Sequence, residues 1–176
     1  MKYILSILFC VCLLSCHQND GTTSDGTTSL EEKKPAITDT SIDKNMLASP
    51  EEMMDDSVFT DGSKPAAWSL TGINDPNQLK IFIKFLRFWV EKGNRDSLAA
   101  HIQYPLQNNK NIASPSDFLK KYDVLFNAKV IKAINDQKLS QIFRNSHGAM
   151  IGNGELWIRN VSSNKTDDFR ITSINN

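Results

Sequence analysis

The chain has 176 residues, enough for one ordinary domain with extensions, and its formal net charge is zero. Residues 17–75 carry twelve acidic and four basic side chains, a net charge of −8, and residues 76–176 carry eight acidic and fifteen basic ones, a net charge of +7. The sequence contains no Lys/Arg-rich run of the kind that binds nucleic acid, so we expect no nucleic-acid partner. The simplest interpretation of this split is a solvated surface, with the acidic tether resting at most loosely on the domain. The alternative is that the basic domain attracts anionic partners such as lipid headgroups or cell-wall polymers.

The first sixteen residues have the pattern of an export signal. Met1-Lys2 is a short positive start, and residues 3–14 form an apolar stretch shorter than the roughly 20 residues of a membrane span. Leu13-Leu14-Ser15-Cys16 resembles the lipobox of bacterial lipoproteins. That resemblance implies cleavage before Cys16, lipid on its sulfur and palmitate-type acylation of the freed amine. The alternative is a plain signal peptide with a coincidental cysteine, but the polar run at residues 17–20 favours the lipoprotein.

The lipid implies a location. Several acyl chains hold a protein stably on a bilayer, so we expect a signal peptide over residues 1–15 and a membrane-anchored protein of the cell envelope. The expected site is the outer membrane, facing the periplasm or the cell surface. Because Cys10 and Cys12 would be removed with the signal peptide, the mature chain would keep one cysteine. It could then form neither an internal disulfide nor a cysteine metal site.

Residues 16–57 have the composition of a flexible acidic tether. Residues 20–29 read DGTTSDGTTS, a tandem repeat of five, and the segment has few aromatic residues. Such a stretch cannot bury enough apolar surface to offset its ordering entropy. Trp68 and Phe59 lie further on, and aromatic residues near a domain entrance usually pack onto the domain. The domain is therefore predicted over residues 58–176, with its core at 75–175.

The first strong element is a helix from residue 75 to about 92. Asp75-Pro76 forms a helix start, and Gly93 ends the helix. Apolar residues follow a helical spacing that predicts a core helix: they are Leu79, Phe82, Ile83, Leu86, Trp89 and Val90. The charged positions, among them Lys80 and Lys84, are expected to form one narrow face in water.

Shorter helices and then strands follow. Helices are predicted over residues 95–102, 114–126 and 129–134. The pattern then changes to extended pieces at residues 142–145, 149–151, 155–161 and 169–174, with a tight turn at Gly152-Asn153-Gly154. Helices followed by an antiparallel meander predict an α+β domain.

This order resembles the cone-shaped α+β domains called nuclear transport factor two-like, which belong to the cystatin-like type of fold. The resemblance is carried by residues 79–106, 114–126, 142–160 and 169–175. It implies three to four N-terminal helices packed on a curved antiparallel sheet, as in small exported bacterial proteins of that fold. The fold serves both enzymes and binding domains, so activity must be argued from a site.

Enzymes of that fold place an acid/base pair in the mouth of the cone. The residues that could serve here are Asp96, His101, Tyr104, Tyr122, Asp123 and His147. No two of them share a motif spacing, and Asp96 suits the first turn of a helix. The histidines are also too scattered for a metal site. We therefore expect no catalytic residues, no metal and no cofactor.

A ligand pocket is the second possibility for the cone. Around such a cavity we expect Trp89, Tyr104, Tyr122, Trp157 and Phe118, and at its mouth Arg144 or Arg159. Together they would bind a small apolar ligand. The simpler expectation is a filled core.

Three functions stay open. The first is a non-catalytic binding or accessory module of the envelope, acting on an envelope protein or a small apolar ligand. The second is an envelope enzyme with acid/base chemistry in the cone mouth. The third is an inhibitor or immunity-type protein that binds a secreted enzyme.

Overall fold

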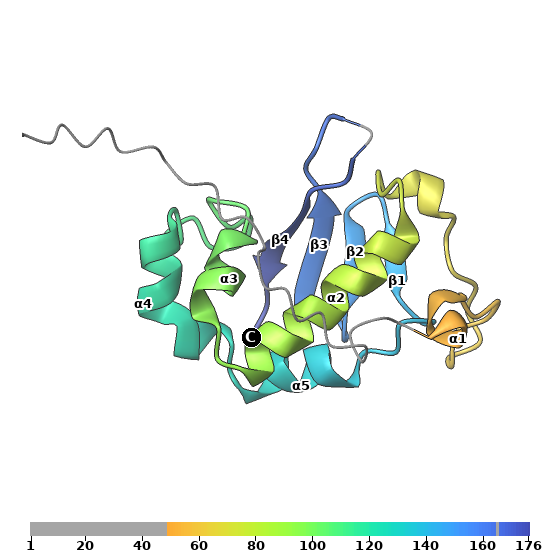
Figure 1. Ribbon diagram of the computed structural model, residues 1–176, viewed down its shortest axis with the longest axis horizontal. Coiled ribbons are helices and arrows are strands. Elements are labelled where there is room, and N and C mark those ends of the chain that lie inside the picture. Colours follow the sequence, from red (N-terminus) through yellow and green to blue (C-terminus); the bar gives the residue numbers. More distant parts are fainter. Residues whose placement is uncertain (1–48, 165) are drawn as a thin grey trace, which may run out of the picture. The chain divides into compact units, whose positions relative to one another are not determined.

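Helices come before strands in chain order (Figure 1). The computed structural model describes residues 49–164 and 166–176. Its helical elements are α1 (Pro50–Met53), the 3₁₀ turn η2 (Trp68–Leu70), α2 (Pro76–Glu91), α3 (Arg95–Ala100), α4 (Pro115–Leu125) and α5 (Ala128–Asp136). The strands are β1 (Phe143–Asn145), β2 (Gly148–Ile151), β3 (Leu156–Asn160) and β4 (Phe169–Ile174), and they form one antiparallel sheet in that order. The predicted α+β class is confirmed.

Helix α2 crosses one face of the sheet (Figure 1). It begins as the sequence predicts, because the Asp75 carboxylate accepts hydrogen bonds from the backbone N–H groups of Asn77 and Gln78. Its apolar row is buried, and Leu79 and Ile83 have no exposed surface. At that level of burial each such side chain contributes about 1.5–3 kcal/mol to folding, so α2 is the main helix of the core.

The two faces of the sheet differ. Ala149 and Ile158 are cross-strand neighbours on the face that carries the core, and both are fully buried. Met150 and Trp157 are the next pair along the same strands and therefore lie on the opposite face. Phe143 pairs with Met150 and is 42% exposed. We call Phe143, Met150 and Trp157 the outer aromatic row.

The free edge of β4 is covered by the chain that follows α3. The backbone N–H of Ile171 donates to the carbonyl of His101 at 2.8 Å, and the N–H of Gln103 donates to the carbonyl of Ile171 at 2.9 Å. Further on, the Asn108 side chain bonds both the N–H and the carbonyl of Ile174. Residues 101–108 therefore act as a partial fifth strand and leave β4 without an open edge.

One glycine is required by close packing. Gly148 has a φ of +111°, and a Cβ atom there would lie 2.3 Å from the carbonyl oxygen of Ile158 and 2.8 Å from Cγ of Arg159. The stem of Arg159 thus passes directly over Gly148. A side chain at this position would have to displace backbone.

Residues 49–70 pack against the domain through a group of charges. Residues 49–57, which we expected to belong to the tether, also contact the domain. Nζ of Lys80 lies 2.7 Å from Oδ1 of Asp55 and donates to the carbonyl of Met53 at 2.8 Å. Lys80 is completely buried, so our expectation that it faces water was wrong.

Arg144 completes this group from the edge strand β1. Its Nη2 lies 3.0 Å from Oδ2 of Asp55, and its guanidinium stacks over the ring of Trp68 at 4.0 Å. The indole N–H of Trp68 donates to the same Oδ2 at 2.6 Å. Burial lowers the pKa of Arg144, and the nearby Asp55 opposes that shift. We call Asp55, Trp68, Lys80 and Arg144 the Asp55 cluster.

Candidate functional site

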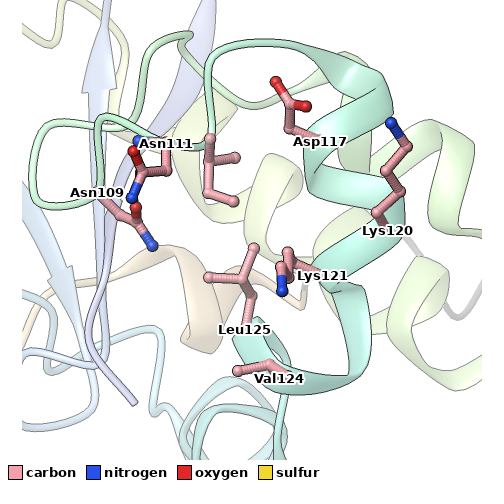
Figure 2. Close-up of a pocket in the computed structure, with 8 residues that line it drawn as sticks. Asn109, Asn111, Asp117, Lys120, Lys121, Val124 and Leu125 are labelled. Atoms are coloured by element: carbon pink, nitrogen blue, oxygen red, sulfur yellow. Dashed lines mark hydrogen bonds between the residues drawn. The ribbon is translucent and has the colours of Figure 1, made fainter.

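A surface pocket lies between α4 and the loop of residues 107–112 (Figure 2). It has a volume of about 200 Å³. Its lining residues are Asn109, Asn111, Ile112, Asp117, Lys120, Lys121, Val124 and Leu125. In Figure 2 the two asparagine amides stand on the loop and Lys121 stands on the facing helix, with Val124 and Leu125 nearby. We call this the α4 pocket.

The helical wall of the pocket is fixed by its cap. The Ser114 side chain accepts a hydrogen bond from the N–H of Asp117, and Pro115 occupies the first helical position. The Ser114 hydroxyl in turn donates to Asp117 Oδ2 at 2.7 Å. These bonds lower the pKa of Asp117, so its carboxylate is ionised and one of its oxygens is occupied.

The loop wall is fixed by backbone hydrogen bonds. The N–H of Leu106 donates to the carbonyl of Ile112 at 3.0 Å, and the N–H of Ile112 donates to the carbonyl of Asn109 at the same distance. Ile112 and Leu106 are buried beneath the loop. The pocket therefore has a preformed wall on each side. This favours ligand binding because the loop and helix lose little conformational freedom when a ligand binds.

Of the residues expected around a cone cavity, Trp89 and Tyr122 belong to the buried core and Tyr104 packs against it. Trp89 lies in the core, with its ring stacked on His101 at 4.5 Å. Tyr122 is buried on α4, with the Arg95 guanidinium 4.3 Å above its ring. Tyr104 donates its hydroxyl proton to the carbonyl of Ala99 at 3.0 Å.

Two further predicted residues lie near the sheet. Arg144 belongs to the Asp55 cluster, on the core face. Trp157 belongs to the outer aromatic row, where it makes edge contacts with Phe143 and His147. The position of Trp157 on the opposite face from the core separates it from Trp89.

Three of the possible acid/base residues, Asp96, Asp123 and His147, are exposed. Asp96 lies in the first turn of α3, as predicted, and Asp123 pairs with Arg95 at 2.7 Å on the surface. His147 is exposed in the β1–β2 turn. Among residues 49–164 and 166–176, no group of three His, Cys, Asp or Glu side chains could hold a metal ion.

Burial shifts the pKa of His101, Tyr104 and Tyr122 among these groups. Nδ1 of His101 lies 2.8 Å from the carbonyl oxygen of Ser97, which can only accept, so Nδ1 carries a proton. Burial against Trp89 and Phe82 lowers the pKa of His101. The neutral ring therefore carries no proton on Nε2. Burial likewise raises the pKa of Tyr104 well above its ordinary value, which leaves its hydroxyl protonated.

Sequence reasoning missed both the α4 pocket and the Asp55 cluster. A signal for the second was present, since acidic residues at 51–56 precede basic residues spaced along one side of α2. Two of these pairs form, between Asp55 and Lys80 and between Glu52 and Lys84, each at 2.7 Å. For the pocket, Asn109 and Asn111 lie in a short polar stretch that carries no motif of a binding site.

Known proteins offer no guide to this site. No protein-family model, curated protein or solved structure matches the chain. In the portion that the structure describes, no helix is long and apolar enough to cross a bilayer.

Proposed function

We propose that this protein is a lipoprotein of the bacterial cell envelope whose domain binds a ligand or partner without transforming it. The observation that carries the anchor is the motif Leu13-Leu14-Ser15-Cys16 directly after an apolar stretch of secretory length. The lipid would hold the protein on a membrane, and the outer membrane, facing the periplasm or the cell surface, is the site we propose.

The hydrogen bonds of the reactive side chains support binding over catalysis. General acid/base chemistry needs two groups within hydrogen-bonding reach of one substrate. Here Nδ1 of His101 is bonded to a backbone carbonyl, and so is the hydroxyl of Tyr104. The α4 pocket, in contrast, has amide and ammonium groups facing open space, as a binding site requires.

The outer aromatic row favours a second candidate, an inhibitor or immunity-type protein. Trp157 and Phe143 meet edge to face at a centroid distance of 6.4 Å on a partly exposed surface. Exposed aromatic clusters are typical of the centres of protein interfaces. A secreted enzyme in the envelope would be the partner on that face.

We further propose that the domain is a variant of the nuclear transport factor two-like cone. The support is a long first helix, shorter helices after it, and a terminal antiparallel meander, with α2 lying across one face of the sheet. The space between α2 and the sheet holds fully buried apolar side chains such as Ile83 and Ile158. A binding site in this variant would therefore be on the surface.

The anchor is tested on protein from its native host. Intact-mass analysis should find a mature chain that begins at Cys16 and carries the mass of the added acyl groups. The Cys16→Ala variant should leave the membrane fraction after a high-salt wash. A wild-type mature chain that begins elsewhere, or carries no fatty mass, would refute the anchor.

The binding role is tested with a photocrosslinking amino acid placed in the host protein at one position at a time. A probe at Lys121 reports on the α4 pocket, one at Phe143 on the outer aromatic row, and one at exposed Lys64 is the control. Protein adducts from Phe143 alone would favour the inhibitor or immunity protein. Adducts equal at all three positions would argue against any specific binding face.

A further inference from the structure

The α4 pocket has unneutralised positive charge. Ten lysines lie in the described part of the chain, and five of them form ion pairs. The five without an ion pair are Lys64, Lys110, Lys120, Lys121 and Lys138. Three of these five, Lys110, Lys120 and Lys121, line or flank the pocket, where the one carboxylate is Asp117. Asp117 is bonded to Ser114 and to the N–H of Ala113 and interacts electrostatically with Lys120, so the three lysines and one carboxylate leave a net charge of +2 that favours an anion.

The asparagines of this region fall into two groups. Asn108 and Asn176 hold the fold, because their amides bond the backbone of Ile174 and Val124. Asn109 uses its Oδ1 weakly, for the N–H of Asn111 at 3.3 Å, and its Nδ2 has no partner in the described residues. The Asn111 amide makes no side-chain hydrogen bond there. Two amides therefore face the pocket with donors and an acceptor to spare.

The floor and size of the pocket restrict the ligand further. Ile112 and Leu125 form an apolar floor, and Val124 beside them is 62% exposed. The volume of about 200 Å³ is smaller than the roughly 300–1,000 Å³ of pockets for drug-sized ligands. The pocket thus suits a small group that is anionic at one end and apolar at the other.

We propose that the α4 pocket binds the C-terminal end of a peptide that carries a free carboxylate and a small apolar last side chain. The ammonium of Lys121 pairs with the carboxylate, and Lys120 and Lys110 add to the positive potential. An asparagine amide has a donor and an acceptor in one plane, so Asn109 and Asn111 complement the last peptide group. The apolar side chain lies on Ile112 and Leu125. The inference deepens the proposed binding role and is independent of the lipid anchor.

The test uses two small probes that differ in one charge. N-acetyl-alanyl-alanine and its C-terminal amide are titrated into the purified full-length chain, and backbone amide chemical shifts are followed by NMR. The free acid should shift the signals of residues 109–112 and 117–125, with saturation at millimolar concentration. The C-terminal amide should bind about two- to fivefold more weakly, because it lacks the charge that pairs with Lys121.

Matched variants locate the site. Lys121→Gln should weaken binding of the free acid about two- to fivefold, as expected for an exposed ion pair. Asn111→Ala should weaken it by a similar factor through lost hydrogen bonds. Lys64→Gln removes the same charge from another exposed, unpaired lysine and should leave binding unchanged. Added salt should weaken binding to the wild type more than binding to Lys121→Gln.

Several outcomes would overturn the inference. The inference fails if the acid and the amide bind equally well, or if no saturable binding is seen. It also fails if the chemical shifts change at residues outside those named, or if Lys64→Gln weakens binding as much as Lys121→Gln does. Inorganic phosphate is titrated as a second anion. If phosphate binds the pocket as strongly as the free acid does, the pocket is a general anion site. If the peptide does not bind but the photocrosslinking probe at Lys121 still captures a partner, the peptide ligand is wrong and the proposed binding role stands. Negative results in both would remove both.

Discussion

Asp55 and Lys80, which are 25 positions apart in the chain, meet at 2.7 Å between the entering segment and the core helix. Lys80 has no exposed surface, so its charge depends on this one carboxylate and on a backbone carbonyl. Oδ1 of Asp55 has the ammonium close by but makes no hydrogen bond of good geometry, so the attraction is chiefly between charges. A buried cation of this kind is costly once its counter-ion is gone.

Asp55→Asn should therefore lower the free energy of unfolding by about 3–5 kcal/mol, since it leaves Lys80 and Arg144 buried without a counter-ion. Urea denaturation followed by circular dichroism measures the change. Asp61→Asn is the control, because Asp61 is exposed and bonds only within its own turn, to Ser63. Equal stability of Asp55→Asn and wild type would show that the cluster is not stabilising.

Lys80→Met should behave differently from Asp55→Asn. A methionine fills much of the same space without a charge, and replacing a buried ion pair by apolar groups is often close to neutral. Because Asp55 keeps its contact with Arg144, we expect Lys80→Met to cost less than half as much as Asp55→Asn. The same denaturation measurement decides it, and a larger loss in Lys80→Met would contradict the account of the cluster.

Trp157→Ala should cost about 1–2 kcal/mol, because the side chain is only partly buried on the outer face of the sheet. Phe118→Ala, which empties a fully buried position, should cost about 3–5 kcal/mol. The comparison is made by chemical denaturation of the two variants in parallel. A loss for Trp157→Ala as large as that for Phe118→Ala would place Trp157 in the core.

Stability should fall in mild acid because of His101. Its folded-state pKa lies below the ordinary 6.5, so the unfolded chain binds the proton more readily. The stabilisation is fully present above pH 6.5 and is lost as the pH falls from 6.5 toward the lowered pKa. Arg170 strengthens this shift, whereas the bond to Ser97 and the charge of Asp168 oppose it.

His101→Phe keeps a ring against Trp89 but cannot titrate. Its free energy of unfolding, measured above and below pH 6.5, should therefore have a smaller pH slope than that of wild type. An unchanged slope would assign the acid sensitivity to other groups.

Gly148→Ala should destabilise strongly, and Gly93→Ala mildly. Both glycines have positive φ, which costs another residue about 1–3 kcal/mol. At Gly93 nothing lies within 4 Å of the added Cβ, so that strain is the whole effect. At Gly148 the Cβ also collides with the Ile158 carbonyl at 2.3 Å, so the loss should exceed that of Gly93→Ala. Thermal unfolding of both variants gives the ranking.

Local sequence signals predicted the regular elements well. Asp75 and Ser114 cap their helices as expected, and the tight turn at residues 152–154 has positive φ at Gly152 and Gly154. Predicted helices over residues 75–92 and 114–126 correspond to α2 and α4. These succeed because caps and turns depend on neighbours a few residues away.

Long-range pairing could not be predicted in the same way. The burial of Lys80 depends on Asp55, and the position of Arg144 depends on Trp68, 76 positions earlier in the chain. The ligand-pocket hypothesis placed Trp157 at a cavity, but the strand register puts it on the face opposite Ala149 and Ile158. The α4 pocket likewise exists because residue 108 is fastened to β4.

The Asp55 cluster also sets how the domain would respond to mechanical load. Tension applied at residue 49 would pass to α2 through the Glu52–Lys84 and Asp55–Lys80 pairs and to β1 through Arg144. Force would be shared between two elements that are distant in sequence, instead of unzipping the protein from one end. The segment at Asp55 is thus the point at which such a load enters the folded domain.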